Sequence, residues 1–155
     1  MRRLILDAAA LLEVLPEFGS LVDLGSGSGF PGLPIAVLEP SRSVLLVDSR
    51  LRRHHFQRTA VRELDLDNVS LLRGRIEALE AQPGDMVIAQ ALARPEQALE
   101  WMIPWARPGG WLAVPGGAEP PQIRATTTDV DATTRHYRVP IGGPQRSLWL
   151  GRRAG

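Results

Sequence analysis

The stretch from Leu21 to Gly32 constrains the fold of this chain more than any other part of its sequence. It reads Leu-Val-Asp-Leu-Gly-Ser-Gly-Ser-Gly-Phe-Pro-Gly. Its apolar start is typical of a short strand, and glycines at alternate positions permit a tight turn or the close approach of a ligand. Pro31 has the fixed φ angle that suits the first turn of a helix. A strand, a glycine loop and a helix N-terminus in this order commonly hold a nucleotide-like cofactor.

The rest of the sequence alternates between segments typical of helices and of strands. We expect helices over residues 4–15, 31–38, 49–64 and 95–106, and strands over residues 21–24, 43–48, 69–73, 85–89 and 111–114. A turn at 108–110, a loop at 116–121, a polar helix after that loop and a hairpin of 135–140 with 147–150 complete the prediction. The alternation predicts an α/β fold with a mostly parallel sheet between helices, and residues 1–155 as one domain.

The composition excludes several kinds of chemistry. The chain has no cysteine, which removes disulfides, thiolate catalysis and cysteine–zinc sites. All 18 basic residues are arginine, so a lysine-containing phosphate loop and a lysine Schiff base are also excluded. No apolar run approaches the length of a membrane span and no signal peptide opens the chain, so we expect a cytoplasmic protein without a membrane partner.

The glycine loop alone is compatible with two cofactors. Residues 27–32 satisfy the pattern G-x-G-x-x-G, which is also found in proteins that bind nicotinamide dinucleotides. Asp48 ends the second predicted strand, where a carboxylate accepts hydrogen bonds from ribose hydroxyls with either cofactor. A third interpretation is that the glycines only make a tight strand-to-helix turn.

Three features favour S-adenosylmethionine. Asp23 precedes the first glycine by two residues, where its carboxylate would reach a cationic amino-acid moiety. The alternation of Gly25, Gly27 and Gly29 suits a cofactor without a pyrophosphate. Ile76-Glu77 follows the third predicted strand, where backbone and a polar side chain would contact an adenine edge.

Four segments carry a resemblance to a known family. They are Asp-Leu-Gly-Ser-Gly-Ser-Gly-Phe-Pro-Gly-Leu-Pro-Ile-Ala from Asp23, Leu-Val-Asp-Ser ending at Ser49, Arg-Glu-Leu at 62–64 and Gly-Arg-Ile-Glu at 74–77. Together they resemble the bacterial small-subunit ribosomal RNA guanine-N7 methyltransferases, also called glucose-inhibited division protein B. Gly-Phe-Pro-Gly is more specific than the glycines alone, and the resemblance extends from about Ile5 to Leu150.

The resemblance implies a class I methyltransferase fold with a seven-stranded sheet whose last strand is antiparallel. It implies methyl transfer from S-adenosylmethionine to small-subunit ribosomal RNA, with the cofactor held at Gly25, Phe30 and the pair Ile76-Glu77. The complete expected set of cofactor-binding residues is Asp23, Gly25, Ser26, Gly27, Gly29, Phe30, Asp48, Ser49, Ile76, Glu77 and Gln90.

The chain also departs from the pattern of that family. The family has a further helical segment before the point where this sequence starts. Its Ser-Arg-Ala after the fourth strand is Ala-Gln-Ala at 89–91, and its Leu-Lys-Gly after the fifth is Val-Pro-Gly at 114–116. Arg94 follows Gln90 by four residues and is a candidate replacement for the missing arginine. These departures motivate an alternative, a shortened homologue that binds adenosylmethionine or RNA without catalysis.

The expected chemistry requires no acid–base residue, because guanine N7 carries a free lone pair at neutral pH. We therefore expect positioning and cofactor residues only, with neither a catalytic acid or base nor a metal site. Candidate RNA contacts are Pro31, Arg50, Arg58 and Arg94.

The predicted helix at 49–64 has two faces. Arg50, His54, Arg58 and Arg62 recur every four residues on one face, for which a solvated outer surface is favoured over an RNA contact. Phe56, Ala60 and Leu64 lie on the other face and are expected to pack on the sheet. Trp101 and Trp105, one helical turn apart, are expected to pack in the core rather than to stack on a base.

Overall fold

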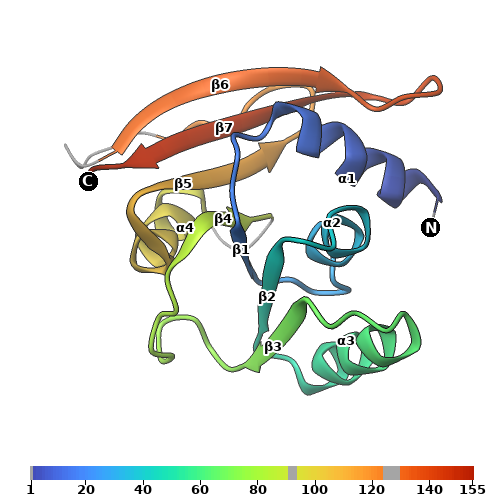
Figure 1. Ribbon diagram of the computed structural model, residues 1–155. Coiled ribbons are helices and arrows are strands. Elements are labelled where there is room, and N and C mark those ends of the chain that lie inside the picture. Colours follow the sequence, from blue (N-terminus) through green and yellow to red (C-terminus); the bar gives the residue numbers. More distant parts are fainter. Residues whose placement is uncertain (1, 91–93, 124–129) are drawn as a thin grey trace.

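A computed structural model describes residues 2–90, 94–123 and 130–155 (Figure 1). The helices are α1 (Arg2–Val14), α2 (Gly32–Leu38), α3 (Leu51–Glu63) and α4 (Pro95–Met102), and a 3₁₀ turn, η1, covers Ile103–Trp105. The strands are β1 (Ser20–Leu24), β2 (Ser43–Asp48), β3 (Val69–Arg73), β4 (Gly84–Ala89), β5 (Ala106–Gly116), β6 (Val130–Arg138) and β7 (Gln145–Arg153).

The strands form one seven-stranded sheet in the order β3-β2-β1-β4-β5-β7-β6. The pairs from β3 to β5 are parallel, whereas β7 runs antiparallel to both β5 and β6. The predicted class I architecture with an antiparallel last strand is therefore confirmed. Strand order reverses between β1 and β4, and ligands of open α/β sheets bind at the carboxyl edge beside such a reversal.

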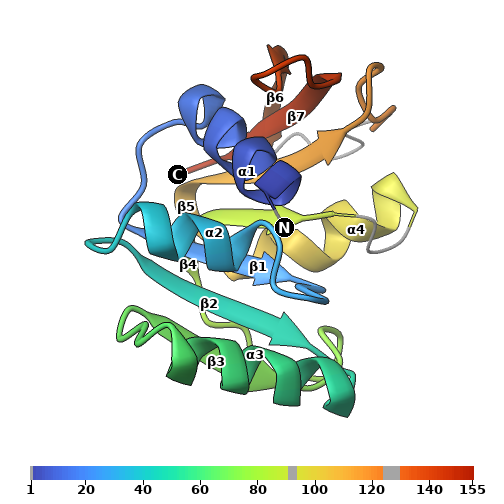
Figure 2. The ribbon, with the colours of Figure 1, turned by 90° about the vertical axis from the view of Figure 1, so that its right-hand side faces the viewer.

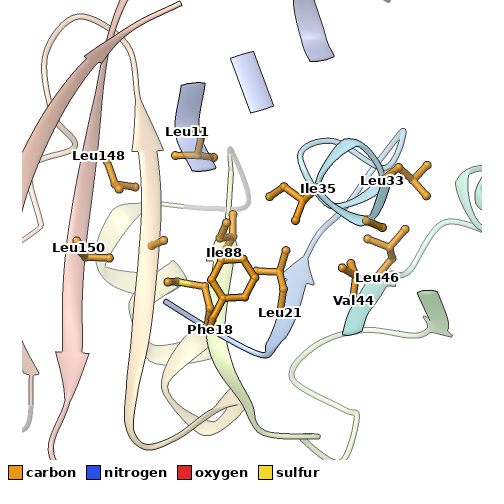
Figure 3. Close-up of a cluster of buried hydrophobic side chains, with 13 residues drawn as sticks. Leu11, Phe18, Leu21, Leu33, Ile35, Val44, Leu46, Ile88, Leu148 and Leu150 are labelled. Atoms are coloured by element: carbon orange, nitrogen blue, oxygen red, sulfur yellow. The ribbon is translucent and has the colours of Figure 1, made fainter. Parts of the chain in front are cut away.

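Alternate residues of the buried strands supply two apolar cores. Leu21 of β1 faces α1, α2 and α3, and its neighbour Val22 faces α4. Figure 1 shows the sheet between these two helical layers. Figure 3 shows that Leu11, Ile35 and Leu148, from α1, α2 and β7, lie in the first core. Figure 2 shows α1 lying over α2 and beside the β6–β7 hairpin, so the first helix of the chain packs against its C-terminal hairpin.

Within the described part of the chain, no helix combines the length and apolar character needed to cross a membrane.

Two predicted boundaries near β5 are wrong. The helix expected over 95–106 ends at Met102, and η1 connects it to β5. The strand then starts at Ala106, so the predicted turn at 108–110 lies within it. Gly109 has φ +77°, and the pairing register with β4 shifts between Gly84 and Met86, which identifies this turn as an irregularity of one long strand.

The predicted terminal hairpin is correct in its position and too short. Strands β6 and β7 pair continuously from Val130 with Arg153 to Arg138 with Gln145. The polar helix expected after the loop at 116–121 falls partly on residues 124–129, which lie outside the described residues, and the chain is a strand from Val130 onward.

The predicted buried face of α3 is correct for Ala60 and wrong for Phe56 and Leu64. Phe56 and Leu64 are 51% and 56% exposed, whereas Gln57 is 1% exposed. Ala60 and Val61 are the apolar residues of this helix that pack against the core. The inward face of α3 therefore includes a polar side chain. The glycine loop packs against this part of the helix, and Gln57 donates hydrogen bonds to Ser26 Oγ and Gly27 O of that loop.

Candidate cofactor and substrate site

The glycine loop leaves β1 with the backbone that its sequence predicts. Gly25, Gly27 and Gly29 have φ angles of +66°, +58° and +92°, which side chains of L-residues rarely permit. A Cβ atom on Gly29 would also lie 2.3 Å from Leu33 Cδ1. The loop thus turns tightly into α2, and the peptide bond between Phe30 and Pro31 at its end is cis.

The carboxylate of Asp48 joins the glycine loop to the end of β2. Its Oδ2 accepts a hydrogen bond from Gly27 N at 2.8 Å, and its Oδ1 accepts one from Arg50 N at 2.8 Å. Arg53 Nη1 lies 3.9 Å from Oδ2. The residue is 6% exposed and still lines a cavity, so its carboxylate has lone pairs available for a ligand.

Gln57 of α3 forms hydrogen bonds with the same loop. Its Nε2 donates hydrogen bonds of 2.7 Å to Ser26 Oγ and to Gly27 O. Ser26 in turn donates from Oγ to Val47 O at 3.3 Å. Gln57 is not among the residues expected from the sequence. Its place one turn after Arg53, in a helix predicted to follow Asp48, is the sequence signal that could have indicated it.

A cavity of about 300 Å³ opens at the carboxyl ends of β1, β2 and β3. Five expected cofactor residues line it: Gly25, Asp48, Ser49, Ile76 and Glu77. The cavity is also lined by Arg50, Arg53, Gly74, Arg75 and Trp101. The structure therefore brings residues from four separate segments of the sequence together around one space, and the five expected cofactor residues come from three of them.

The two tryptophans of the α4 region differ in their surroundings. Trp105 is 1% exposed and belongs to the second core, as expected. Trp101, which was also expected to pack in the core, is instead partly buried and lines the cavity. The spacing of four residues predicts that the two tryptophans share one helix face. They do not, because α4 ends at Met102 and Trp105 belongs to the 3₁₀ turn that follows.

Asp23 lies behind the glycine loop and is not part of the wall of this cavity. It is 1% exposed, and its Oδ2 accepts a hydrogen bond of 3.0 Å from Gly32 N at the start of α2. Burial raises the pKa of the Asp23 carboxyl to about 8, partly opposed by the Gly32 hydrogen bond and assisted by the nearby Asp48. This carboxyl therefore fixes the position of the first turn of α2.

A second cavity, of about 520 Å³, lies on the other side of the glycine loop. It is lined by Ser26, Gly27, Ser28, Phe30, Arg52, Arg53, Phe56 and Gln90. A recess of about 50 Å³ adjoins it and shares Phe30 and Gln90 with it. The remaining walls of the recess are Leu4, Asp7, Ala8, Leu11, Pro31, Pro115 and Tyr137.

The four expected RNA contacts do not gather on one surface. Arg50 lines the first cavity, Pro31 lines the recess, and Arg94 is exposed immediately before α4. Arg58 lines a separate hollow of about 540 Å³ between α3 and β3, together with His55.

His54, which the sequence places on the outer face of α3, is only partly exposed. Burial lowers the pKa of its imidazole, as do the nearby positive charges of Arg58 and Arg73 and the neighbouring His55. It therefore does not extend a basic stripe between Arg50 and Arg58.

Comparison with known proteins decides the family. The family model described as "GidB: rRNA small subunit methyltransferase G" matches residues 1–148. The chain belongs to the GidB family. It is 40% identical over 111 residues to the ribosomal RNA small subunit methyltransferase G of Thermobifida fusca, an alignment that covers 71% of this chain and 47% of that relative. It is 36% identical over 153 residues to that of Corynebacterium efficiens, covering 96% and 63%.

A solved structure agrees with the fold of this GidB family chain. A mutant of MtNAS in complex with S-adenosylmethionine superimposes with a TM-score of 0.73 at 15% identity, over 99% of this chain and 63% of that one. This likeness establishes the class I fold. The chain spans about half the length of the first of these GidB relatives.

Proposed function

We propose that this chain binds S-adenosylmethionine and transfers its methyl group to N7 of a guanine in small-subunit ribosomal RNA. The observation that carries the proposal is the convergence of the glycine loop, Asp48 and the turn after β3 on one cavity at the carboxyl edge of the sheet. Membership of the GidB family and the substrate named for its relatives support the same reaction.

The residues of the first cavity suit the parts of this cofactor. Asp48 would accept hydrogen bonds from the ribose hydroxyls, and the backbone of Ile76 with Glu77 would read the adenine edge. Trp101 offers an aromatic wall for the adenine ring. Gly25 leaves space for the methionine portion to approach the backbone, and Ser49 completes the wall beside Asp48.

The remaining expected residues support the cavity from outside it. Ser26, Gly27 and Gly29 shape the loop, and Asp23 anchors its far end through Gly32. Asp23 would therefore help to place the cationic amino-acid moiety of the cofactor by holding the loop, and would not contact that moiety directly.

The second cavity suits the acceptor base. Bound adenosylmethionine would supply the methyl group on a positively charged sulfur. Phe30 and Gln90, which were expected to bind the cofactor, line the second cavity and the recess instead of the first cavity. In this place they would hold a purine beside the glycine loop and keep water from it. Because N7 needs no deprotonation, positioning of the two reactants is the main task of these residues.

A second candidate function rests on the same two pockets. Gln90 and Pro115, which replace an arginine and a lysine of the family pattern, both line the recess. A chain that retains the cofactor cavity and has lost charge beside the acceptor would bind adenosylmethionine or RNA without methylating it.

Two measurements test these proposals. Calorimetric titration should show binding of adenosylmethionine and not of NAD, and the reverse result would identify a dinucleotide-binding oxidoreductase. The protein should then transfer a labelled methyl group to small ribosomal subunits or to their naked RNA, and mass spectrometry should locate the label on a guanine. Cofactor binding without transfer to either substrate would favour the non-catalytic binder.

The proposed substrate, small-subunit ribosomal RNA, also implies a cellular location for this protein. A protein that modifies the small ribosomal subunit works where ribosomes are assembled, which in bacteria is the cytoplasm. Fluorescent fusion and sedimentation of cell extracts would place the protein with small subunits, and a purely membrane-associated fraction would argue against this assignment.

A further inference from the structure

A carboxylate faces a recess that is otherwise largely apolar. Asp7 of α1 is the only acidic residue on the described walls, and Leu4, Ala8 and Leu11 come from the same helix. The side chain of Asp7 is 27% exposed, so it remains accessible to a ligand. A carboxylate in such a place is able to accept hydrogen bonds from a ligand that enters the recess.

Two residues from the far end of the chain hold this carboxylate in place. Arg146 of β7 places its Nε and Nη2 atoms 3.2 Å and 3.0 Å from Asp7 Oδ2. Tyr137 of β6 also lines the recess, and burial together with the nearby Asp7 raises the pKa of its phenol to about 12. The phenol therefore stays protonated at neutral pH. The carboxylate is oriented by both neighbours and, with two lone pairs on each oxygen, retains acceptor capacity.

The recess continues a space that is large enough for a base. Its own volume of about 50 Å³ is too small for a purine, whereas the adjoining cavity of about 520 Å³ lies against the glycine loop. Phe30 and Gln90 form the shared wall. A base in the larger cavity would thus extend only one edge into the recess and toward Asp7.

Guanine is the base whose edge suits a carboxylate. Its N1–H and its 2-amino group are adjacent donors on the Watson–Crick edge, and the two oxygens of a carboxylate accept from both. Adenine has an acceptor at N1, which a carboxylate repels. N7 lies on a different edge of the purine, so this edge is free to be bound while N7 faces the methyl donor. Enzymes that modify an extruded base commonly read it through this edge.

We propose that Asp7 selects the acceptor guanine by accepting hydrogen bonds from its N1–H and 2-amino groups, with Arg146 as the residue that positions the carboxylate. This inference rests on the proposed methyl transfer and adds the residue that would determine its base specificity.

The test compares guanosine with inosine, which lacks only the 2-amino group. Once the methylated position has been mapped, small-subunit RNA is assembled by ligation with either nucleoside at that position. The wild-type chain should methylate the inosine RNA with kcat/KM roughly ten- to a hundredfold lower, as expected for the loss of a hydrogen bond to a charged group.

Two variants separate recognition from intrinsic reactivity. Asp7→Asn has nearly the same shape but presents one acceptor and one donor group, so its preference for guanosine over inosine should fall to within a few-fold. Glu13→Gln makes the same chemical change at an exposed position of α1 and should retain the wild-type preference. Calorimetric affinity for adenosylmethionine should be the same in all three proteins, which shows that the cofactor cavity is intact.

Each result has a distinct meaning. Transfer to neither RNA by the wild-type chain would refute the proposed methyl transfer itself. Equal transfer to guanosine and inosine RNA by the wild-type chain would refute the role of Asp7 without needing any variant. Retention of the full preference by Asp7→Asn would do the same.

Discussion

The hydrogen bonds from Gln57 to the glycine loop give the sharpest test of how α3 supports the site. Gln57→Leu removes the donor of both 2.7 Å bonds and leaves Ser26 Oγ and Gly27 O in a buried environment without it. A neutral hydrogen bond contributes about 0.5–1.5 kcal/mol, and a buried group left unpaired costs about 1–3 kcal/mol. The free energy of unfolding should therefore fall by roughly 2–4 kcal/mol.

The same change should weaken cofactor binding although Gln57 is not a wall of the cofactor cavity. If the loop of the variant holds its binding conformation one-tenth of the time, the affinity for adenosylmethionine falls about tenfold. Urea unfolding and calorimetric titration measure the two effects. Gln97→Leu is the matched control, because Gln97 is exposed and, among the described residues, its side chain donates to Glu100 alone, at 3.4 Å. A Gln57→Leu protein that matches this control within about 0.5 kcal/mol and binds cofactor equally well would refute the reasoning.

Three further changes test other parts of the site. Asp48→Asn should reduce the affinity for adenosylmethionine by about 1.5–3 kcal/mol in a calorimetric titration, because the amide loses the charge that strengthens its bonds to ribose, and Asp67→Asn on an exposed loop should not. Trp101→Leu should reduce that affinity by about 0.5–1.5 kcal/mol if the indole stacks on adenine, whereas Trp111→Leu on β5 should leave it unchanged. The pKa of Asp23, raised from 3.8 to about 8, means that the folded state keeps a proton that the unfolded state loses, so this residue lowers stability as pH rises from about 4 to 8. Asp23→Asn should therefore gain stability relative to the wild type across that window in urea unfolding, by up to ~6 kcal/mol at about 1.4 kcal/mol for each pKa unit, and a difference that does not grow with pH would contradict the assignment.

The parallel part of the fold could be predicted because its signals are local. Continuous apolar runs such as Ser43–Asp48 are strands buried on both faces, and the glycines after Leu24 mark the turn into the next helix. The boundaries of β5 could not be predicted in this way. Pro108 and the glycines after it are typical of a turn, and only the partner strand β4 shows that the chain stays in the sheet through an irregular register.

Residue roles on α3 were harder to predict than the helix itself. Phe56 is apolar and was expected to be buried, yet it lines the open second cavity, while Gln57 is buried beneath the loop. Helical periodicity finds the apolar side of a helix only when the neighbouring surface is apolar. Here the neighbouring surface is a loop of exposed backbone groups, whose hydrogen-bonding needs are set by the tertiary fold.

The first cavity of the candidate site could be predicted from the sequence, whereas the recess that contains Asp7 could not. Gly25, Asp48 and Glu77 follow three successive strands, and the carboxyl ends of parallel strands meet at one edge. Asp7 lies in the first helix of the chain, and nothing local in the sequence connects it to Arg146, which lies 139 residues later. Contacts of that range depend on where the antiparallel strands return across the sheet.

The attachment of α1 to the final hairpin has a consequence for how the molecule is made. Asp7 pairs with Arg146, and Arg135 Nη1 donates a hydrogen bond to Val14 O, so the earliest helix is anchored by the last strands to be translated. Among the described residues, those that line the first cavity all precede Met102. During synthesis the ribosome therefore delivers the described walls of that cavity before the residues of β6 and β7 that complete the recess and its ion pair.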